Sequence, residues 1–206
     1  MNGIMHEELL YWQLNGQVQR ALLYDGQDEE ELLRGHLITA GLVMPEDDVT
    51  IVLKEGLWQV QKPEKAGTVF FEELKPLNTP FCIRMNELDL LCNQVMALDN
   101  SAGLHAILLS DGEKVVIGRD VGRHNALDKA VGKAIQSGLK LGNAALCGSG
   151  RLSLEMLSKA AFAGIPVLAT RKQVGSLCVQ YAERLNIAVC CVGKEPICYS
   201  TNWRIL

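Results

Sequence analysis

The chain has 206 residues, 48% of them hydrophobic, and a formal net charge of −4 at neutral pH. The apolar fraction is large enough to build a core, which excludes intrinsic disorder. The acidic balance argues against a dedicated nucleic-acid binder, which needs a basic face for phosphates. No apolar run approaches the roughly 18 residues that span a bilayer, and the first eight residues lack the features of a secretory signal. We therefore expect a cytoplasmic protein without a membrane or nucleic-acid partner.

The cysteines predict free thiols. There are seven, an odd number, and no two are spaced as Cys-x-x-Cys, which disfavours both a disulfide scaffold and a zinc ribbon. Cys147, Cys190 and Cys191 lie in apolar runs, where cysteine packs as a small hydrophobe. We expect no tightly held metal.

Residues 1–75 predict a small N-terminal α+β domain. The expected elements are a hairpin (9–24), a helix with an acidic first turn (28–41), a set of strands (49–73) and a linker with two prolines (75–80). The expected turns are Asn15-Gly16, Glu55-Gly56 and Ala66-Gly67.

Residues 76–206 alternate between helical and strand patterns. The expected order is a helix after residue 84, a hairpin (105–117) turning at Asp111-Gly112, a helix (123–137), a strand (144–148), a helix (151–163), a strand (166–170), a helix (175–185) and strands (187–192, 197–204). Such alternation predicts an α/β domain with helices on both faces of a central sheet. The alternative to a separate N-terminal domain is that its strands complete one joint unit.

The densest group of polar side chains lies between the strand-like run 115–117 and the helix-like run that follows. It consists of Arg119, Asp120, Arg123, His124, Asn125, Asp128 and Lys129. Ligands of α/β proteins bind outside the carboxyl ends of strands, so this segment predicts a ligand or catalytic site. Helical spacing puts Asp128 one turn behind His124, where it could fix the tautomer of the imidazole. Arg119 and Arg123 could bind an anion; the alternative is a structural network in which the aspartates neutralise the arginines.

A glycine-rich turn follows the next apolar strand. The sequence Cys147-Gly148-Ser149-Gly150-Arg151 allows close approach of a phosphate to the backbone, although it is no Walker A loop. Ser149, Gly150 and Arg151 are candidate anion ligands; an ordinary strand–helix turn is equally compatible with the pattern.

Two further residues are candidates. His105 begins an apolar strand in the segment 101–106, a position that favours a core residue over a ligand; a zinc deaminase site is rejected because its glutamate and Pro-Cys-x-x-Cys are missing. Cys82 follows Pro80 and precedes a helix, and with Arg84 nearby it is the cysteine best placed to be reactive. An unreactive, semi-buried thiol is the alternative.

Taken together, these motifs resemble the FdhD (formate dehydrogenase accessory) family. The resemblance is carried by residues 119–129, by Ser149-Gly150-Arg151 with Glu155 and Lys159, by residues 102–106, by residues 163–167, and upstream by residues 31–37 and 40–43. It implies a cytidine-deaminase-like three-layer α/β domain with a mixed sheet plus a smaller domain, often as a homodimer.

The resemblance also implies a task. Such proteins accept sulfur from a cysteine desulfurase and pass it to the molybdenum or tungsten bis-guanine-dinucleotide cofactor of formate dehydrogenase or a related molybdoenzyme. Guanine nucleotides such as GDP bind as mimics of that cofactor. The implied cofactor-binding residues are His105, Arg119, Asp120, Arg123, His124, Asn125, Asp128, Lys129, Ser149, Gly150 and Arg151, with Cys82 as the candidate catalytic thiol.

The sequence departs from the family pattern at one motif, and this departure leaves three hypotheses for the function. The family's Cys-Gly-x-Cys motif is missing, and the corresponding interval reads Leu77-Asn78-Thr79-Pro80-Phe81-Cys82-Ile83-Arg84. The first hypothesis is a sulfurtransferase with a persulfide on Cys82. The second is a cofactor carrier or chaperone without sulfur transfer. A third is a stable α/β domain with an unrelated small-anion ligand.

Overall fold

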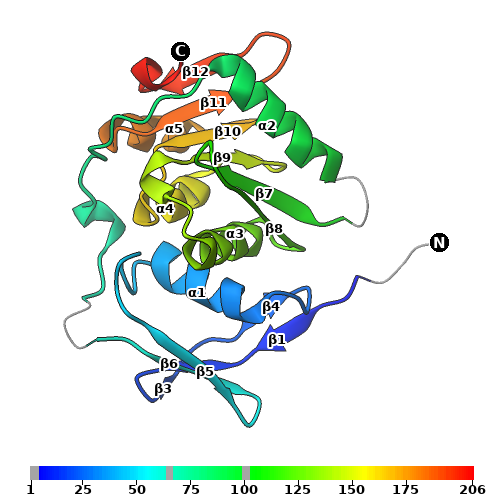
Figure 1. Ribbon diagram of the computed structural model, residues 1–206, viewed down its shortest axis with the longest axis vertical. Coiled ribbons are helices and arrows are strands. Elements are labelled where there is room, and N and C mark those ends of the chain that lie inside the picture. Colours follow the sequence, from blue (N-terminus) through cyan, green and yellow to red (C-terminus); the bar gives the residue numbers. More distant parts are fainter. Residues whose placement is uncertain (1–4, 64–66, 99–102) are drawn as a thin grey trace.

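The computed structural model describes residues 5–63, 67–98 and 103–206 and shows a mixed α/β fold (Figure 1). Its central sheet has the strand order β12-β11-β10-β9-β7-β8. The strands are β7 (His105–Ser110), β8 (Val115–Asp120), β9 (Ala145–Gly148), β10 (Val167–Thr170), β11 (Ala188–Cys191) and β12 (Ile197–Ser200). β9, β10 and β11 run parallel, whereas β7, β8 and β12 join through antiparallel pairs. The predicted mixed sheet is confirmed.

Helices cover both faces of this sheet, which confirms the three layers (Figure 1). α2 (Met85–Leu98) covers one face, and α3 (Arg123–Ser137), α4 (Leu154–Phe162) and α5 (Ser176–Arg184) cover the other. Successive strand residues point to opposite faces. Accordingly, Leu108 belongs to the apolar cluster under α2, while Ile107 and Leu109 belong to the larger cluster under α3 and α4.

The N-terminal part packs on α3 through a further helix, α1 (Glu29–Thr39). Beyond α1 lie two small sheets, β1-β4 and β3-β2-β6-β5 (Figure 1). Their strands are β1 (Glu8–Leu10), β2 (Trp12–Leu14), β3 (Gln17–Val18), β4 (Leu22–Tyr24), β5 (Thr50–Lys54) and β6 (Leu57–Gln61). One apolar cluster runs from Leu10 and Tyr24 through α1 to the central sheet. This continuity is what one joint unit would show; the boundary at residue 75 stays a prediction.

Two glycines allow α1 and α3 to pack unusually closely. A Cβ on Gly35 would lie 1.7 Å from the backbone oxygen of Asp128, and one on Gly132 would lie 2.0 Å from that of Glu31. Any side chain at either position would push the helices apart. The close packing brings α1 side chains within reach of the polar segment that begins α3.

Most predicted elements are confirmed, with four corrections. The strands expected over 49–73 end at Gln61, and residues 71–73 form a 3₁₀ turn instead. The hairpin 9–24 turns at Asn15-Gly16, but its second strand breaks, and β4 pairs with β1 so that Tyr24 enters the core. The helix expected at 151 begins at Leu154, because Ser153 caps it by accepting from the Met156 N–H. The last strand ends at Ser200, where Thr201 adopts a left-handed conformation before a 3₁₀ turn (Asn202–Arg204). Further 3₁₀ turns span Phe71–Glu73 and Leu141–Asn143. Ala66, Ser101 and Ala102, named above, lie outside the described residues.

Candidate functional site

The two predicted walls of the site lie on the same edge of the central sheet. β8 and β9 both run antiparallel to β7, so their carboxyl ends point the same way. His105 pairs with Asp120, and Ile107 pairs with Gly148, which sets the start of β7 between the two strand ends. Residues 119–129 and 149–151 therefore flank His105, although they are distant in sequence.

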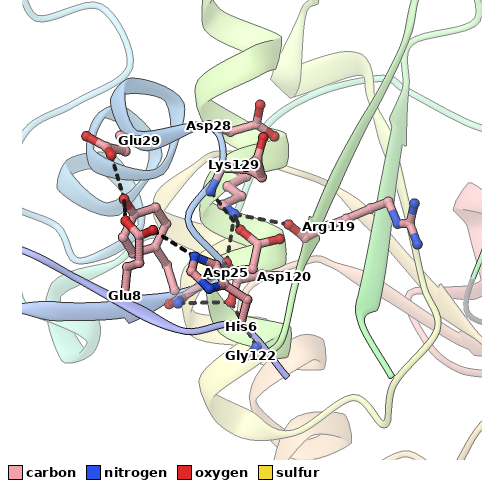
Figure 2. Close-up of polar contacts among 12 residues, drawn as sticks. His6, Glu8, Asp25, Asp28, Glu29, Arg119, Asp120, Gly122 and Lys129 are labelled. Atoms are coloured by element: carbon pink, nitrogen blue, oxygen red, sulfur yellow. Dashed lines mark hydrogen bonds and ion pairs between the residues drawn. The ribbon is translucent and has the colours of Figure 1, made fainter. Parts of the chain in front are cut away.

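A buried ion-pair cluster fixes the start of α3 (Figure 2). The Lys129 ammonium lies 2.7 Å from Asp120 and 2.5 Å from Asp25, and it donates to the backbone oxygen of Arg119 at 3.2 Å. The side chains of Lys129 and Asp120 are both 0% exposed. Because charges held away from water need full pairing, this cluster strongly favours one position of the segment 119–129.

Asp120 also shapes the loop before α3. Its carboxylate accepts from the Gly122 N–H at 2.9 Å and from the Asn125 amide at 3.2 Å. The same amide of Asn125 donates to the backbone oxygen of Leu23 at 2.6 Å. The polar groups of Asp120 and Asn125 therefore bind other groups of the protein, and the Asp120 carboxylate neutralises a lysine rather than an arginine.

A second buried network surrounds Asp128. Its carboxylate accepts hydrogen bonds from Lys159 on α4 at 2.7 Å and Thr39 on α1 at 2.6 Å, and it lies 3.2 Å from Nδ1 of His36. Burial alone would raise the pKa of Asp128, but the Lys159 charge and the His36 contact outweigh it and lower the pKa to about 2. Asp128 therefore joins three helices as a carboxylate.

The predicted partnership of His124 and Asp128 needs correction. The imidazole Nε2 of His124 lies 3.0 Å from the Glu155 carboxylate of α4, and Asp128 is held by the other network. The two residues do share one side of α3, but Asp128 turns toward α1. Burial lowers the pKa of His124, and the positive charge of Arg123 acts in the same direction against Glu155, so neutral imidazole is favoured.

Arg123, His124, Gly150, Arg151 and His105 form the part of the site that a ligand could contact. Arg151 is exposed, and Arg123, His124 and His105 are half-buried. A Cβ on Gly150 would lie 3.5 Å from His105 Nδ1 and 3.6 Å from the Arg123 side chain, so the glycine leaves open the space between them. His105 Nδ1 is shielded from solvent and has no hydrogen-bond partner among the described residues.

Ser149 and Arg119 have different surroundings from those expected. Ser149 is buried, and its hydroxyl accepts from the Ala106 N–H at 3.0 Å, which fixes the glycine-rich turn to β7. Arg119 donates to the backbone oxygen of Leu98 at 3.3 Å, and its side chain points away from Lys129 (Figure 2). It thus extends toward the α2 side, whereas Arg123 lies on α3. The structure does not bring the two arginines together as a pair.

A cavity of about 550 Å³ opens beside His124. It is lined by Thr39, Ala40, Phe71, His124, Leu154, Glu155, Ser158, Lys159 and Phe162. Its walls are mostly apolar, with charged groups only where α3 and α4 approach each other. The cavity extends the ligand-accessible part of the site toward α1.

Cys82 lies at the opposite end of the sheet. Its Sγ is 3.6 Å from the backbone oxygen of Trp203, and the adjacent Ile83 pairs with Ile205. Because Ser200 pairs with Val189 in antiparallel register, the chain after β12 is level with the amino ends of the parallel strands. Residues 119–129 and 149–151 follow the carboxyl ends instead. The structure therefore does not bring Cys82 together with the other candidates.

Sequence reasoning missed the α1 contribution to the site. Asp25, His36 and Thr39 supply partners to α3, and Asp28 pairs with Lys133 at 2.5 Å. Only Gly35 signalled this contact, since a glycine within a helix can indicate close packing. Among the described residues, no group of histidine, cysteine or acidic side chains could hold a metal ion, and no helix could cross a membrane.

The fold and this edge place the chain among α/β proteins with a polar site at the carboxyl end of a central sheet. The chain belongs to the FdhD/NarQ family, whose match covers residues 68–206. The N-terminal part that supplies Asp25 and His36 precedes the matched region.

Proteins named "Sulfur carrier protein FdhD" are similar to this chain. The one from Streptomyces avermitilis is 53% identical over 94 residues, which are 44% of this chain and 33% of that protein. The one from Mycolicibacterium paratuberculosis is 33% identical over 171 residues, covering 77% of this chain and 61% of that protein. The chain thus spans about a third to three fifths of these relatives' length.

A solved structure shares the fold over nearly the whole chain. The crystal structure of a "putative formate dehydrogenase accessory protein" from Desulfotalea psychrophila superposes with a TM-score of 0.84 and 25% identity. The superposition covers 98% of this chain and 90% of that one. The relatives support the family, and this solved structure supports the α/β fold.

Proposed function

We propose that this protein is a formate dehydrogenase accessory protein that binds the molybdenum or tungsten bis-guanine-dinucleotide cofactor at the carboxyl edge of its sheet. It delivers sulfur from a cysteine desulfurase to that cofactor. The observation that carries the proposal is that Gly150 lies beside both the Arg123 side chain and the unpartnered Nδ1 of His105, with His124 following Arg123 and Arg151 following Gly150 in sequence. We propose a homodimer in the cytoplasm as its working form.

The chemistry of this edge suits a diphosphate. Arginine guanidinium groups bind phosphate through paired hydrogen bonds, and the N–H groups at the start of a helix favour anions. No acidic residue lies in the first turn of α3 itself; the nearby carboxylates are Asp120, which is paired with Lys129, and Glu155, which is 3.0 Å from Nε2 of His124. Gly150 allows close approach, and His105 Nδ1 offers a hydrogen-bonding group that the protein itself does not use.

The cavity beside His124 suits the rest of such a ligand. Its volume of about 550 Å³ is in the range of small-molecule sites, and Phe71 and Phe162 provide apolar surface for a flat ring. The buried residues Asp120, Asp128, Lys129 and Ser149, together with the half-buried Asn125, serve by holding these walls in place.

Direct binding experiments test this proposal. We expect GDP to bind the full chain, and Arg123→Ala to weaken binding at least about tenfold through loss of a charge-assisted contact. The matched control is Arg20→Ala, an exposed arginine in the N-terminal part. Calorimetric titration measures both. If intact protein shows no GDP binding, or if both variants bind like the parent, the assignment of this edge is wrong.

The position of Cys82 favours a second candidate for the sulfur step, a cofactor carrier or chaperone without sulfur transfer through Cys82. The thiol lies near Trp203, at the amino ends of the parallel strands. Incubation with a cysteine desulfurase, cysteine and pyridoxal phosphate, followed by mass mapping, distinguishes the candidates. A gain of one sulfur at Cys82 supports transfer through that residue, and its absence supports the carrier. GDP binding should survive Cys82→Ser in either case.

A further inference from the structure

Four of the cysteines lie together beneath α2. They are Cys92, Cys147, Cys190 and Cys198, which are all free thiols that pack in the same apolar cluster. Three of them are fully buried, but Cys198 is on the edge strand β12 and is half-buried. The thiol cluster therefore reaches the surface at Cys198.

Cys190 and Cys198 face each other directly across two antiparallel strands. They are register partners in the β11–β12 pair. Residues so placed have Cβ atoms about 4.5–5.5 Å apart, close to the roughly 3.5–4.5 Å that a disulfide spans. The strand register shifts between Val189 and Cys190, and such an irregularity loosens the local ladder. A small local adjustment can therefore join the two sulfur atoms.

The pair is electrostatically asymmetric. The hydrogen bond from Cys190 lowers the pKa of Cys198 to about 7, against the opposing effect of burial. The same hydrogen bond and its deeper burial raise the pKa of Cys190 far above its ordinary value. This asymmetry favours the thiolate, which is the nucleophilic form, at Cys198 rather than at Cys190.

We propose that Cys198 and Cys190 form a reactive dithiol that accepts sulfane sulfur from a persulfide donor. The Cys198 thiolate attacks the outer sulfur of the donor R–S–SH, forming Cys198–S–SH and releasing the donor thiolate. The Cys190 sulfur then attacks Sγ of Cys198. The S–S bond of the persulfide breaks, the proton of the Cys190 thiol passes to the departing hydrosulfide, hydrogen sulfide leaves, and a Cys190–Cys198 disulfide remains.

The two steps balance. One donor persulfide and two protein thiols give one donor thiol, one hydrogen sulfide and one disulfide. The sulfane sulfur gains two electrons, and the cysteine pair loses two. This inference rests on the sulfur-carrying role proposed above and assigns it to a thiol other than Cys82.

Cys191 provides a matched control. It follows Cys190 in sequence and is half-buried, like Cys198. Strand alternation turns it to the other face, where its Sγ lies 3.4 Å from the backbone oxygen of Lys172. If accessibility alone determined reactivity, Cys191 would react as readily as Cys198.

The experiment exposes the reduced full chain to glutathione persulfide and follows intact mass, peptide mass and released sulfide. The parent protein should lose about 2 Da, release sulfide and yield a peptide pair linked through Cys190 and Cys198. Cys190→Ala should instead accumulate a gain of about 32 Da on Cys198. Cys198→Ser should lower the rate of sulfide release at least about tenfold, since the thiolate is lost. Cys191→Ser and Cys82→Ser should react like the parent.

A different outcome overturns the proposal. Sulfur found on Cys82 or Cys191 with Cys198 unmodified, or an unchanged rate in Cys198→Ser, would show that the pair is structural. Parent protein gives the linked peptides without any substitution, so misfolding of a Cys190 variant cannot obscure the result. GDP binding is measured separately by titration of the parent and of Cys198→Ser. If the parent does not bind GDP, cofactor binding is refuted, but the dithiol result stands.

Discussion

Replacing Lys129 with methionine tests whether the buried ion-pair cluster holds the start of α3. Methionine fills similar space but leaves the carboxylates of Asp25 and Asp120 facing each other without their ammonium, and Asp120 is 0% exposed. Removing one partner from a buried pair costs about 3–5 kcal/mol. For a chain of this size, each kcal/mol lowers Tm by about 2–4 °C, so the melting point should fall by roughly 10 °C.

The same helix supplies the control for this substitution. Lys133 lies one turn later and pairs with Asp28 at 2.5 Å, but its side chain is 29% exposed and that of Asp28 is 35% exposed. Water screens such a pair, so Lys133→Met should cost only about 0–1 kcal/mol. Urea unfolding followed by circular dichroism measures both variants. Equal losses for Lys129→Met and Lys133→Met would refute the argument that burial determines the cost.

Three further predictions concern α1, Asp128 and His124. Gly35→Ala places a Cβ 1.7 Å from the Asp128 backbone oxygen and should cost at least about 2–3 kcal/mol in urea unfolding, whereas Gly142→Ala, with no atom within 4 Å, should cost under about 1 kcal/mol. The lowered pKa of Asp128 stabilises the fold above the unfolded value near 4, and that contribution is lost as pH falls toward about 2. As the pH falls from about 4 to about 2, the free energy of unfolding of the parent should fall by about 2 kcal/mol more than that of Asp128→Asn. Parallel pH profiles for the two proteins would contradict this. Glu155→Gln should lower the pKa of His124 further, because the negative charge of Glu155 in the parent raises that pKa. An upward shift of the His124 pKa in an NMR titration of the variant would refute the contact.

The local patterns were sufficient to predict most elements. The helix 123–137 and the strand–helix alternation after it follow from apolar periodicity. The turns Asn15-Gly16 and Glu55-Gly56 are also where the sequence predicts them, and both residues of each turn have positive φ angles. The broken second strand of the first hairpin was not predictable in this way. Its last residues pair with β1 because Tyr24 packs into a core that residues beyond 120 complete.

The candidate site was predicted only in part. Because strand ends meet at one sheet edge, the pattern was enough to place Arg123 near Gly150. It did not distinguish ligand-accessible from buried polar residues: Lys129 and Asp128 satisfy their charges inside the protein. Apart from Asp120, which pairs with Lys129, their side-chain partners Asp25, Lys159 and His36 lie more than 30 positions away, which no local spacing reveals.

The sequence by itself determined the fold class, the family resemblance and the strand–helix junction where the site lies, because these depend on periodicity and on short motifs. Only the tertiary structure decided which polar side chains are available to a ligand. It also separated Cys82 from the site and set Cys198 opposite Cys190. The reason is physical: burial and partner choice arise from strand order and helix packing, which join residues that are distant along the chain.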